Sequence, residues 1–384
     1  MKTSSIINKE RNACCGCASC RDICPKEAIS MVPDAEGFYY PVVDTEKCID
    51  CGLCKKNCPT ERHNLKNKSH IQATFCGRYK DPQRVKVVSS GGFCDAAANE
   101  TLNGGGVVYG VGYSNDFHQV VVKRIDAKEE LDQIRGSKYV QSIKSDGIYK
   151  RIKTDLKSGL KVLFIGVPCD VAAVKNYIGE FDNLTTIEII CSGVPSPEVH
   201  KQFVSYIEDK YKSKITSFTY RKKQYGWHWP YVEAKCGDKI IYNKSWSTME
   251  LGYAFMTLLR PSCYNCQFKS QYNMADVTVG DFWGLKKNDS RYYNNGVSAI
   301  ITHTEKGTTL TNGLKDFDLK NSSYDEIKTG NPRLYSCPKP RVNRRQFSES
   351  FISKGLIRSY KESLTIKDRI RNLVMTIYSI FNLR

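Results

Sequence analysis

Long apolar runs are missing from this chain of 384 residues, whose mean hydropathy is −0.46. No stretch reaches the ~18 consecutive apolar residues that a membrane-spanning helix needs, so we expect no such helix. The first ten residues also lack the apolar segment of a secretory signal peptide. Because 40% of the residues are nevertheless hydrophobic, we expect a folded protein with a real core.

Several functional motifs are missing as well. We find no Ser/His/Asp set and no paired-carboxylate motif, so any chemistry should belong to bound cofactors. Neither a Rossmann nor a Walker spacing is present. The net charge is +18, but no nucleic-acid-binding module is recognisable, so we expect no nucleic acid partner. The surplus charge could attract an anionic substrate, an acidic redox partner or an anionic surface, and a merely solvated basic surface explains it equally well.

Cysteine, by contrast, is abundant, with 17 residues. Eight of them form two copies of the pattern Cys-x2-Cys-x2-Cys-x3-Cys-Pro, which is typical of bacterial ferredoxins. Disulfide scaffolds are usually short and secreted, so this clustering favours metal and a reducing cytoplasm. Zinc sites use four ligands in two pairs, so two complete copies indicate [4Fe-4S] clusters instead.

The spacing also predicts how the ligands are shared. Three cysteines at two-residue gaps can surround one cubane, and the fourth ligates the other cluster. Cluster I is predicted to use Cys14, Cys17, Cys20 and Cys58. Cluster II is predicted to use Cys48, Cys51, Cys54 and Cys24. Cys15 is left over and is interpreted as a buried bystander.

The chain is predicted to have an α+β fold in four segments. These are a small ferredoxin-like domain (1–62), a polar linker (63–72), a larger mixed α/β flavin-binding domain (73–345) and a basic tail with an amphipathic helix (346–384). Between the cysteine runs, residues 29–43 predict a hairpin with its turn at 34–37. Apolar runs predict further strands near 106–113, 120–122, 161–165, 184–191, 277–279 and 297–302. Helical spacing is found at 95–102, 147–157 and 197–212.

The tail from Ser363 onward has apolar residues at three- and four-residue steps. Thr365 and Asp368 resemble a capping box at its start. Such a helix could lie on a membrane surface, which would make the protein peripheral to the inner face of the membrane. Docking against the body or a partner subunit is the favoured alternative.

A second set of four cysteines is dispersed through the larger domain. Cys169 and Cys191 follow predicted strands, and Cys263 and Cys266 form a Cys-x2-Cys pair. The four could converge on a third [4Fe-4S] cluster. Buried thiols for the first two and a zinc half-site for the pair are the alternatives.

Six short motifs together resemble the coenzyme F420 hydrogenase/dehydrogenase beta-subunit family, here preceded by a ferredoxin module. They are Ser90–Gly92, Arg135–Gln141, Gly166–Cys169, Cys191–Pro197, Pro261–Cys266 and Gly280–Gly284. The resemblance spans most of residues 73–345. It implies bound FAD, and it implies that Cys169, Cys191, Cys263 and Cys266 hold a cluster.

The resemblance also implies where FAD would be held. Ser90, Gly91 and Gly92 would lie near its pyrophosphate, Arg135, Ser137 and Lys138 would help to hold the cofactor, and Gly280, Asp281 and Gly284 would pass close to it. Small residues at a helix start suit a phosphate independently, although an ordinary helix cap explains them too. Val167 stands where many relatives have threonine.

The predicted function is an iron–sulfur flavoprotein oxidoreductase that exchanges electrons with a redox protein or small molecule and acts on an organic substrate. Relatives suggest coenzyme F420 or a role in polysaccharide biosynthesis. An electron-transfer subunit serving a partner enzyme is the main alternative, and a scaffold with structural clusters ranks last. The segment Tyr225–Tyr231 predicts either an aromatic lid, with His228 as proton donor, or a core segment.

Overall fold

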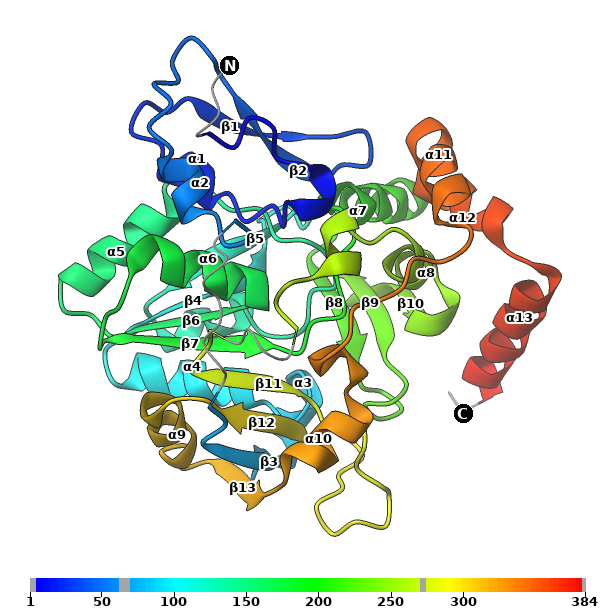
Figure 1. Ribbon diagram of the computed structural model, residues 1–384. Helices are drawn as coiled ribbons and strands as arrows, with labels where there is room; N and C mark the ends of the chain where they lie inside the picture. Colours follow the sequence, from blue (N-terminus) through cyan, green and yellow to red (C-terminus); the bar gives the residue numbers. More distant parts are fainter. Residues whose placement is uncertain (1–4, 62–69, 270–273, 382–384) are drawn as a thin grey trace.

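The computed structural model describes residues 5–61, 70–269 and 274–381 (Figure 1). Most of the linker predicted at 63–72 therefore lies outside the described residues. In the part of the chain that is described, no helix is long and apolar enough to cross a membrane.

The N-terminal segment is built around the predicted hairpin. Strands β1 (Ile29–Pro33) and β2 (Tyr39–Val43) pair antiparallel. The Asp34 side chain organises the turn, because its Oδ1 accepts hydrogen bonds from the backbone N–H groups of Glu36 and Phe38, both at 3.0 Å. The short helices α1 (Ser19–Asp22) and α2 (Leu53–Asn57) complete this segment. It packs against α5 (Ile148–Lys157) and α6 (Pro168–Ile178) of the larger body (Figure 1).

The body is centred on an eight-stranded mixed sheet in the order β13-β3-β12-β11-β7-β6-β4-β5. Neighbours β11, β7, β6 and β4 are parallel, and the remaining pairs are antiparallel. The mixed architecture and the predicted strands are confirmed, whereas β3 and β13 were not anticipated. The strands are β3 (Ala73–Tyr79), β4 (Val107–Tyr113), β5 (Val120–Ile125), β6 (Val162–Gly166), β7 (Leu184–Ile189), β11 (Val277–Asp281), β12 (Ser298–Thr302) and β13 (Phe317–Asn321).

Both faces of this sheet are covered by helices. Successive side chains of each central strand point to opposite faces, so neighbouring residues enter different cores. Val108 and Leu163 pack with α4 (Phe93–Asn103). Tyr109 and Phe164 pack with α5 and α6 on the other face. Other helices around the sheet are α3 (Pro82–Val87), α9 (Glu305–Asn312) and α10 (Tyr324–Gly330), with 3-10 turns η1 (Arg11–Ala13), η2 (Lys128–Gln133), η4 (Pro261–Asn265) and η5 (Pro332–Leu334).

A second, three-stranded antiparallel sheet lies beside the first and was not predicted. It consists of β8 (Ser217–Lys222), β9 (Tyr231–Cys236) and β10 (Lys239–Ser245). One hydrophobic core joins it to the helices α7 (Pro197–Tyr211), α8 (Glu250–Thr257), α11 (Arg344–Lys354) and α12 (Leu356–Ser363), next to the turn η3 (Trp246–Thr248). The C-terminal helices therefore belong partly to the core of the body.

The last helix, α13 (Ile366–Phe381), stands at one side of the molecule (Figure 1). Its predicted capping box is present: Asp368 N donates to Thr365 Oγ1 at 3.1 Å, and Thr365 N donates to Asp368 Oδ2 at 3.1 Å. Arg371 and Asn372 bond to the body through polar contacts. The apolar face is exposed at Ile366 (79%), Ile370 (58%), Leu373 (61%) and Val374 (56%). The side chains beyond residue 375 lie outside the described part.

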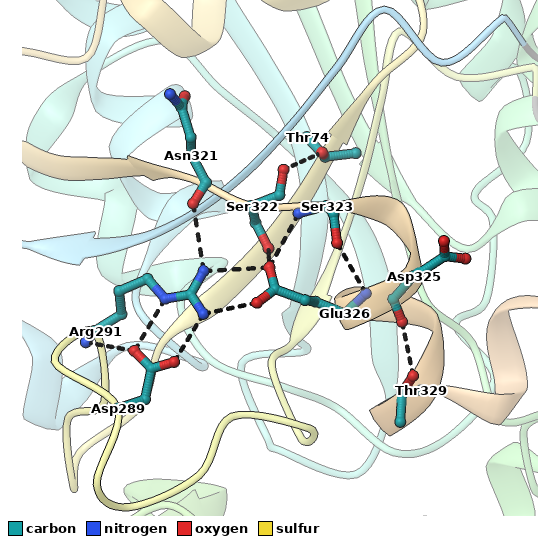
Figure 2. A network of polar contacts seen from close by, with 9 residues as sticks. All are labelled: Thr74, Asp289, Arg291, Asn321, Ser322, Ser323, Asp325, Glu326 and Thr329. Atoms are coloured by element: carbon teal, nitrogen blue, oxygen red, sulfur yellow. Dashed lines mark hydrogen bonds and ion pairs between the residues drawn. The ribbon is translucent and has the colours of Figure 1, made fainter.

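Arg291 ties the loop after β11 to the start of α10 (Figure 2). Its Nη2 lies 2.7 Å from Asp289 Oδ2 and 2.9 Å from Glu326 Oε1. Glu326 also forms a capping box with Ser323. The hydrogen bonds from Arg291 lower the pKa of Asp289 and the pKa of Glu326, each to about 2.

We expect Arg291→Met to lower the free energy of unfolding by up to about 1 kcal/mol at pH 7, since the network is partly exposed and screened. Both carboxyls have pKa values below their ordinary range, so their stabilisation is present above the unfolded pKa and is lost as pH falls towards 2. The difference between wild type and variant should therefore shrink below about pH 5. Denaturant unfolding at several pH values measures this difference in the free energy of unfolding. Arg345→Met, which removes an exposed ion pair on a helix, serves as control. A difference independent of pH would contradict the assignment.

Candidate iron–sulfur and cofactor sites

The two cysteine runs adopt the same unusual backbone. Gly16 (φ +71°) and Ala18 (φ +65°) flank Cys17 in the first run. Asp50 (φ +52°) and Gly52 (φ +73°) occupy the corresponding positions in the second run. Left-handed residues are uncommon outside glycine, and such strain is typical of functional loops. A left-handed residue on each side of the central cysteine turns the chain around one point, as a cubane requires.

The predicted ligands of cluster I come together, including the crossing one. Cys14, Cys17 and Cys20 are buried. Cys58 from the second run lies close enough to Cys17 for a charge on Cys17 to raise the pKa of Cys58. Burial raises the pKa of Cys20 well above its ordinary range, and the other three sulfurs add to this effect. Hydroxyl groups accompany two sulfurs: Ser19 Oγ lies 3.4 Å from Cys17 Sγ, and Thr60 Oγ1 lies 3.3 Å from Cys58 Sγ.

The predicted ligands of cluster II line one cavity. Cys24, Cys48, Cys51 and Cys54 surround it together with apolar side chains such as Ile49 and Leu53. The backbone N–H of Ala28 donates to Cys24 Sγ at 3.4 Å. Cys51 is exposed, whereas three thiols of the other set are buried. Cluster II would therefore face the surface, and cluster I would face the body.

Both sets fit a cubane by their chemistry. Each offers four thiols and no imidazole or carboxylate, which matches the ligand set of a [4Fe-4S] cluster. Within the described residues, no three His, Cys, Asp or Glu side chains are grouped closely enough to hold a single metal ion. A cubane demands wider spacing, because its own irons and sulfides lie between the ligands.

The second cysteine set also converges. Cys169 follows β6 and Cys191 follows β7, and the C-terminal ends of neighbouring parallel strands meet at one edge of a sheet. Cys263 lies in η4, and Cys266 follows that turn. Cys169 and Cys263 each lie in electrostatic contact with both Cys191 and Cys266. Burial raises the pKa of Cys263 to about 12 and that of Cys266 to about 11.

Cys15 lies between the two sets. Its thiol contacts the thiols of both Cys169 and Cys17 through hydrogen bonds. The prediction that Cys15 is a buried bystander did not include these contacts, because the spacing of the first run does not indicate which residues of the body Cys15 meets. Sequence reasoning also missed Cys337, whose Sγ donates to Cys266 O at 3.5 Å, and Lys269, whose Nζ donates to Cys191 O and Arg333 O.

Part of the residue set expected near FAD is brought together. Ser90 Oγ donates to Val297 O at 2.7 Å and lies 3.5 Å from Gly280 O. Ser137 Oγ lies 2.7 Å from the hydroxyl of Ser89, in the same loop as Ser90. Asp281 pairs with Arg221 at 2.6 Å. Gly91 has no room for a side chain, since a Cβ would come 2.1 Å from Gly77 O.

The remaining expected residues have other partners. Arg135 Nε donates to Asp95 Oδ1 at 2.7 Å, next to the left-handed Gly92 that begins α4. Lys138 Nζ donates to the carbonyls of Ile134, Arg135 and Gly136, and burial lowers its pKa to about 7. Gly284 packs against α10, where a Cβ would come 3.1 Å from Gly330 N. These groups shape the loop rather than presenting free charge to a ligand.

The segment Tyr225–Tyr231 has features of both predictions, the aromatic lid and the core segment. Trp227 is fully buried and stacks on Trp283 at 5.2 Å, as a core residue would. His228 is exposed beside Trp283, at 5.3 Å between ring centroids. Lys223, on the same connection, is buried and donates to Ser90 O at 2.6 Å, and burial lowers its pKa to about 7.

Two family comparisons cover separate parts of the chain. The family described as the C terminus of the coenzyme F420 hydrogenase/dehydrogenase beta subunit matches residues 159–323. The 4Fe-4S dicluster domain matches residues 13–62. The first match contains Cys169, Cys191, Cys263 and Cys266, and the second contains all eight cysteines of the ferredoxin pattern.

Two relatives match the N-terminal part of the sequence, and one solved structure was aligned with a larger part of the chain. Two uncharacterized ferredoxins of Methanocaldococcus jannaschii are 38% identical over 60 residues and 39% identical over 62 residues. Each match spans 16% of this chain, and they span 74% and 38% of the relatives. A chain of the F420-reducing [NiFe] hydrogenase complex from Methanosarcina barkeri aligns with a TM-score of 0.46 and 17% identity, covering 74% of this chain and 94% of that one.

We expect anaerobically prepared wild type to contain about twelve iron atoms per chain, at four per cubane, and Cys263→Ser to contain about eight. The reason is that Cys263 would be one of four ligands to the third cubane. Metal analysis measures both iron and zinc. Cys236→Ser, which alters a thiol at the end of β9, serves as control and should keep all the iron. Unchanged iron in Cys263→Ser would remove it from the ligand set, and stoichiometric zinc would favour a zinc site.

Proposed function

We propose that this protein is an FAD-dependent iron–sulfur oxidoreductase, because residues 13–62 match the 4Fe-4S dicluster domain and residues 159–323 match the C terminus of the coenzyme F420 hydrogenase/dehydrogenase beta subunit. At a coarser level, it is an iron–sulfur electron-transfer protein related to that beta subunit. When bound, [4Fe-4S] clusters pass single electrons, and FAD converts between one- and two-electron chemistry. The chain itself would supply the cysteines that hold the clusters and the groups that hold FAD.

The observation that carries the proposal is the contact made by Cys15. Its thiol touches Cys17 of the first ferredoxin run and Cys169 of the second set. We propose that clusters I and II are ligated with Cys24 and Cys58 crossed over, and that a third [4Fe-4S] cluster is held by Cys169, Cys191, Cys263 and Cys266. The cysteine sets then form a continuous series from the exposed Cys51 to the half-buried cysteines at the sheet edge.

We propose that FAD lies at the C-terminal edge of the parallel strands, which is where open α/β sheets bind ligands. Gly91 and Gly92 immediately precede α4 there, and the N–H groups of the first turn of that helix suit a phosphate. The Lys223 Nζ, with its pKa lowered to about 7 by burial, can hold or release a proton near neutral pH. Asp281 Oδ1 is buried without a hydrogen-bond partner in the described residues, so it can accept a donor from a ligand.

For the substrate we propose a small organic acceptor, and intermediates of polysaccharide assembly are the class to screen first. Coenzyme F420 is the competing acceptor. His228 is a candidate proton donor because it is exposed beside Trp283, which is itself 41% exposed. Burial lowers the pKa of His228, so it would be largely neutral at pH 7.

A second candidate is an electron-transfer subunit that serves a partner enzyme. The surface at cluster II favours it, because Ile49 is 60% exposed and Leu53 is 40% exposed beside the exposed Cys51. Exposed apolar side chains around a redox site suit transient docking of a redox protein. In both candidates the protein would work in the cytoplasm.

The FAD assignment is tested by the absorption spectrum after anaerobic cluster reconstitution and incubation with FAD. We expect retained flavin at about one per chain. We also expect Asp281→Asn to weaken its retention, because the variant loses the ion pair with Arg221 beside the site. Asp155→Asn, the same change at an ion pair with Arg124 between α5 and β5, serves as control. An acceptor screen on the reduced protein then separates the two candidates, since a pure electron-transfer subunit would reduce a redox protein but no organic acceptor.

The tail is tested with anionic liposomes. We propose that the exposed apolar face of α13 and the basic tail give peripheral contact with the inner membrane surface. Removal of residues 363–384, or Ile370→Glu combined with Leu373→Glu, should abolish co-sedimentation at low salt. Ile352→Glu, at an exposed site on α11, should not. Absence of binding by the intact protein would refute membrane contact and leave docking to a partner subunit.

A further inference from the structure

Arg260 is a buried cation held between the two cysteine sets. It is 1% exposed and immediately precedes η4, the turn that carries Cys263. Its Nε donates to Cys14 O at 2.7 Å, its Nη1 donates to Gln141 Oε1 at 2.9 Å, and its Nη2 donates to Tyr39 O at 2.9 Å. The same Nη2 lies 3.7 Å from Cys14 Sγ. One guanidinium thus contacts the first ligand of cluster I.

The oxygen acceptors around Arg260 are uncharged. Among the described residues, no Asp or Glu forms an ion pair with it. The aromatic rings of Tyr40 and Phe38 face the guanidinium at 4.2 and 5.4 Å. A buried cation without an anion is strongly unfavourable, so the fold must supply negative charge nearby.

Two other buried cations near the same sulfurs show the contrast. Lys9, close to Cys14 and Cys58, is paired with Glu61. Lys144, close to Cys17 and Cys169, is paired with Asp170 at 2.9 Å. Each of these pairs is electrically neutral as a unit. Of the three cations, Arg260 is the one that brings a net positive charge to the cysteines.

We propose that Arg260 is the counter-charge of cluster I and raises its reduction potential. This inference rests on the proposed ligation of cluster I by Cys14. A cubane held by four thiolates is anionic, and it gains a further negative charge on reduction. A fixed cation against one ligand sulfur therefore stabilises the reduced form more than the oxidised form, in line with the dependence of cluster potentials on charge and hydrogen bonds to sulfur.

The surroundings of Arg260 leave it little freedom to move. A Cβ on Gly16 would come 2.8 Å from Arg260 Nη1 and 2.4 Å from Gln141 Nε2. Gln141 Nε2 in turn donates to Cys15 O at 3.1 Å. The guanidinium is thus clamped against the cysteine loop, and its effect on cluster I should depend on its charge rather than on a mobile contact.

The test is a redox titration followed by electron paramagnetic resonance, which resolves the potentials of the reduced clusters. Arg260→Met should lower one potential by at least a tenfold change in the oxidised-to-reduced ratio, which is about 59 mV for one electron. Arg260→Lys keeps the charge and should recover most of this shift. Gln141→Glu should lower the same potential, because it places a carboxylate against Arg260 in nearly the same shape.

Gln133→Glu, the same chemical change at an exposed position, serves as control and should move no potential. The iron content and the electron paramagnetic resonance signals of the wild type test the proposed ligation of cluster I separately. Low iron or missing cluster signals in the wild type would therefore contradict that ligation rather than the role of Arg260. With iron content intact, unchanged potentials in Arg260→Met and Gln141→Glu would overturn the inference. An equal shift in Arg260→Lys and Arg260→Met would also overturn it, because it would show a structural effect. If Arg260→Met loses its clusters, Gln141→Glu alone decides.

Discussion

The attachment of the first cysteine loop to the body is the contact on which the rest of this structure depends. Tyr149 OH donates to Cys17 O at 2.6 Å, and Arg260 donates to Cys14 O. Arg21 reaches the carbonyls of Lys144 and Ser145 from the other side. These bonds are made mainly to backbone carbonyls, so they hold the loop while leaving its sulfurs available. They hold the ferredoxin segment against the part of the body that carries Cys169.

The sequence predicted the cysteine pattern and some of the strands but not the others, and the reasons are physical. Apolar runs identified the central strands because both faces of a parallel sheet are covered, as at Leu163 and Phe164. The strand β3 and most of the second sheet escaped notice, because their residues mix polar and apolar side chains without clear alternation, as in Lys239–Ser245. The two cysteine runs could be recognised from their spacing, since the repeated pattern is a local property of the chain.

What the sequence could not predict is how distant segments meet. Gln141, Arg260 and Cys15 are separated by more than a hundred residues, yet they share hydrogen bonds at one point. No local pattern marks Arg260, whose neighbours in the chain suggest only a turn before a Cys-x2-Cys pair. The expected flavin residues show the opposite case. Arg135 and Lys138 look suited to phosphate in the sequence, but the fold occupies them with Asp95 and with carbonyls of their own loop.

The crossing of Cys24 and Cys58 between the two runs has a consequence for how the protein is made. Under the proposed ligation, neither cubane can be completed by one run alone, because each waits for a cysteine from the other. The chain between the runs, with its hairpin at 29–43, must already be folded back before either cluster is closed. Iron loading and folding of the N-terminal segment are then a single cooperative event, and a chain carrying only one complete cluster should be rare in the cell.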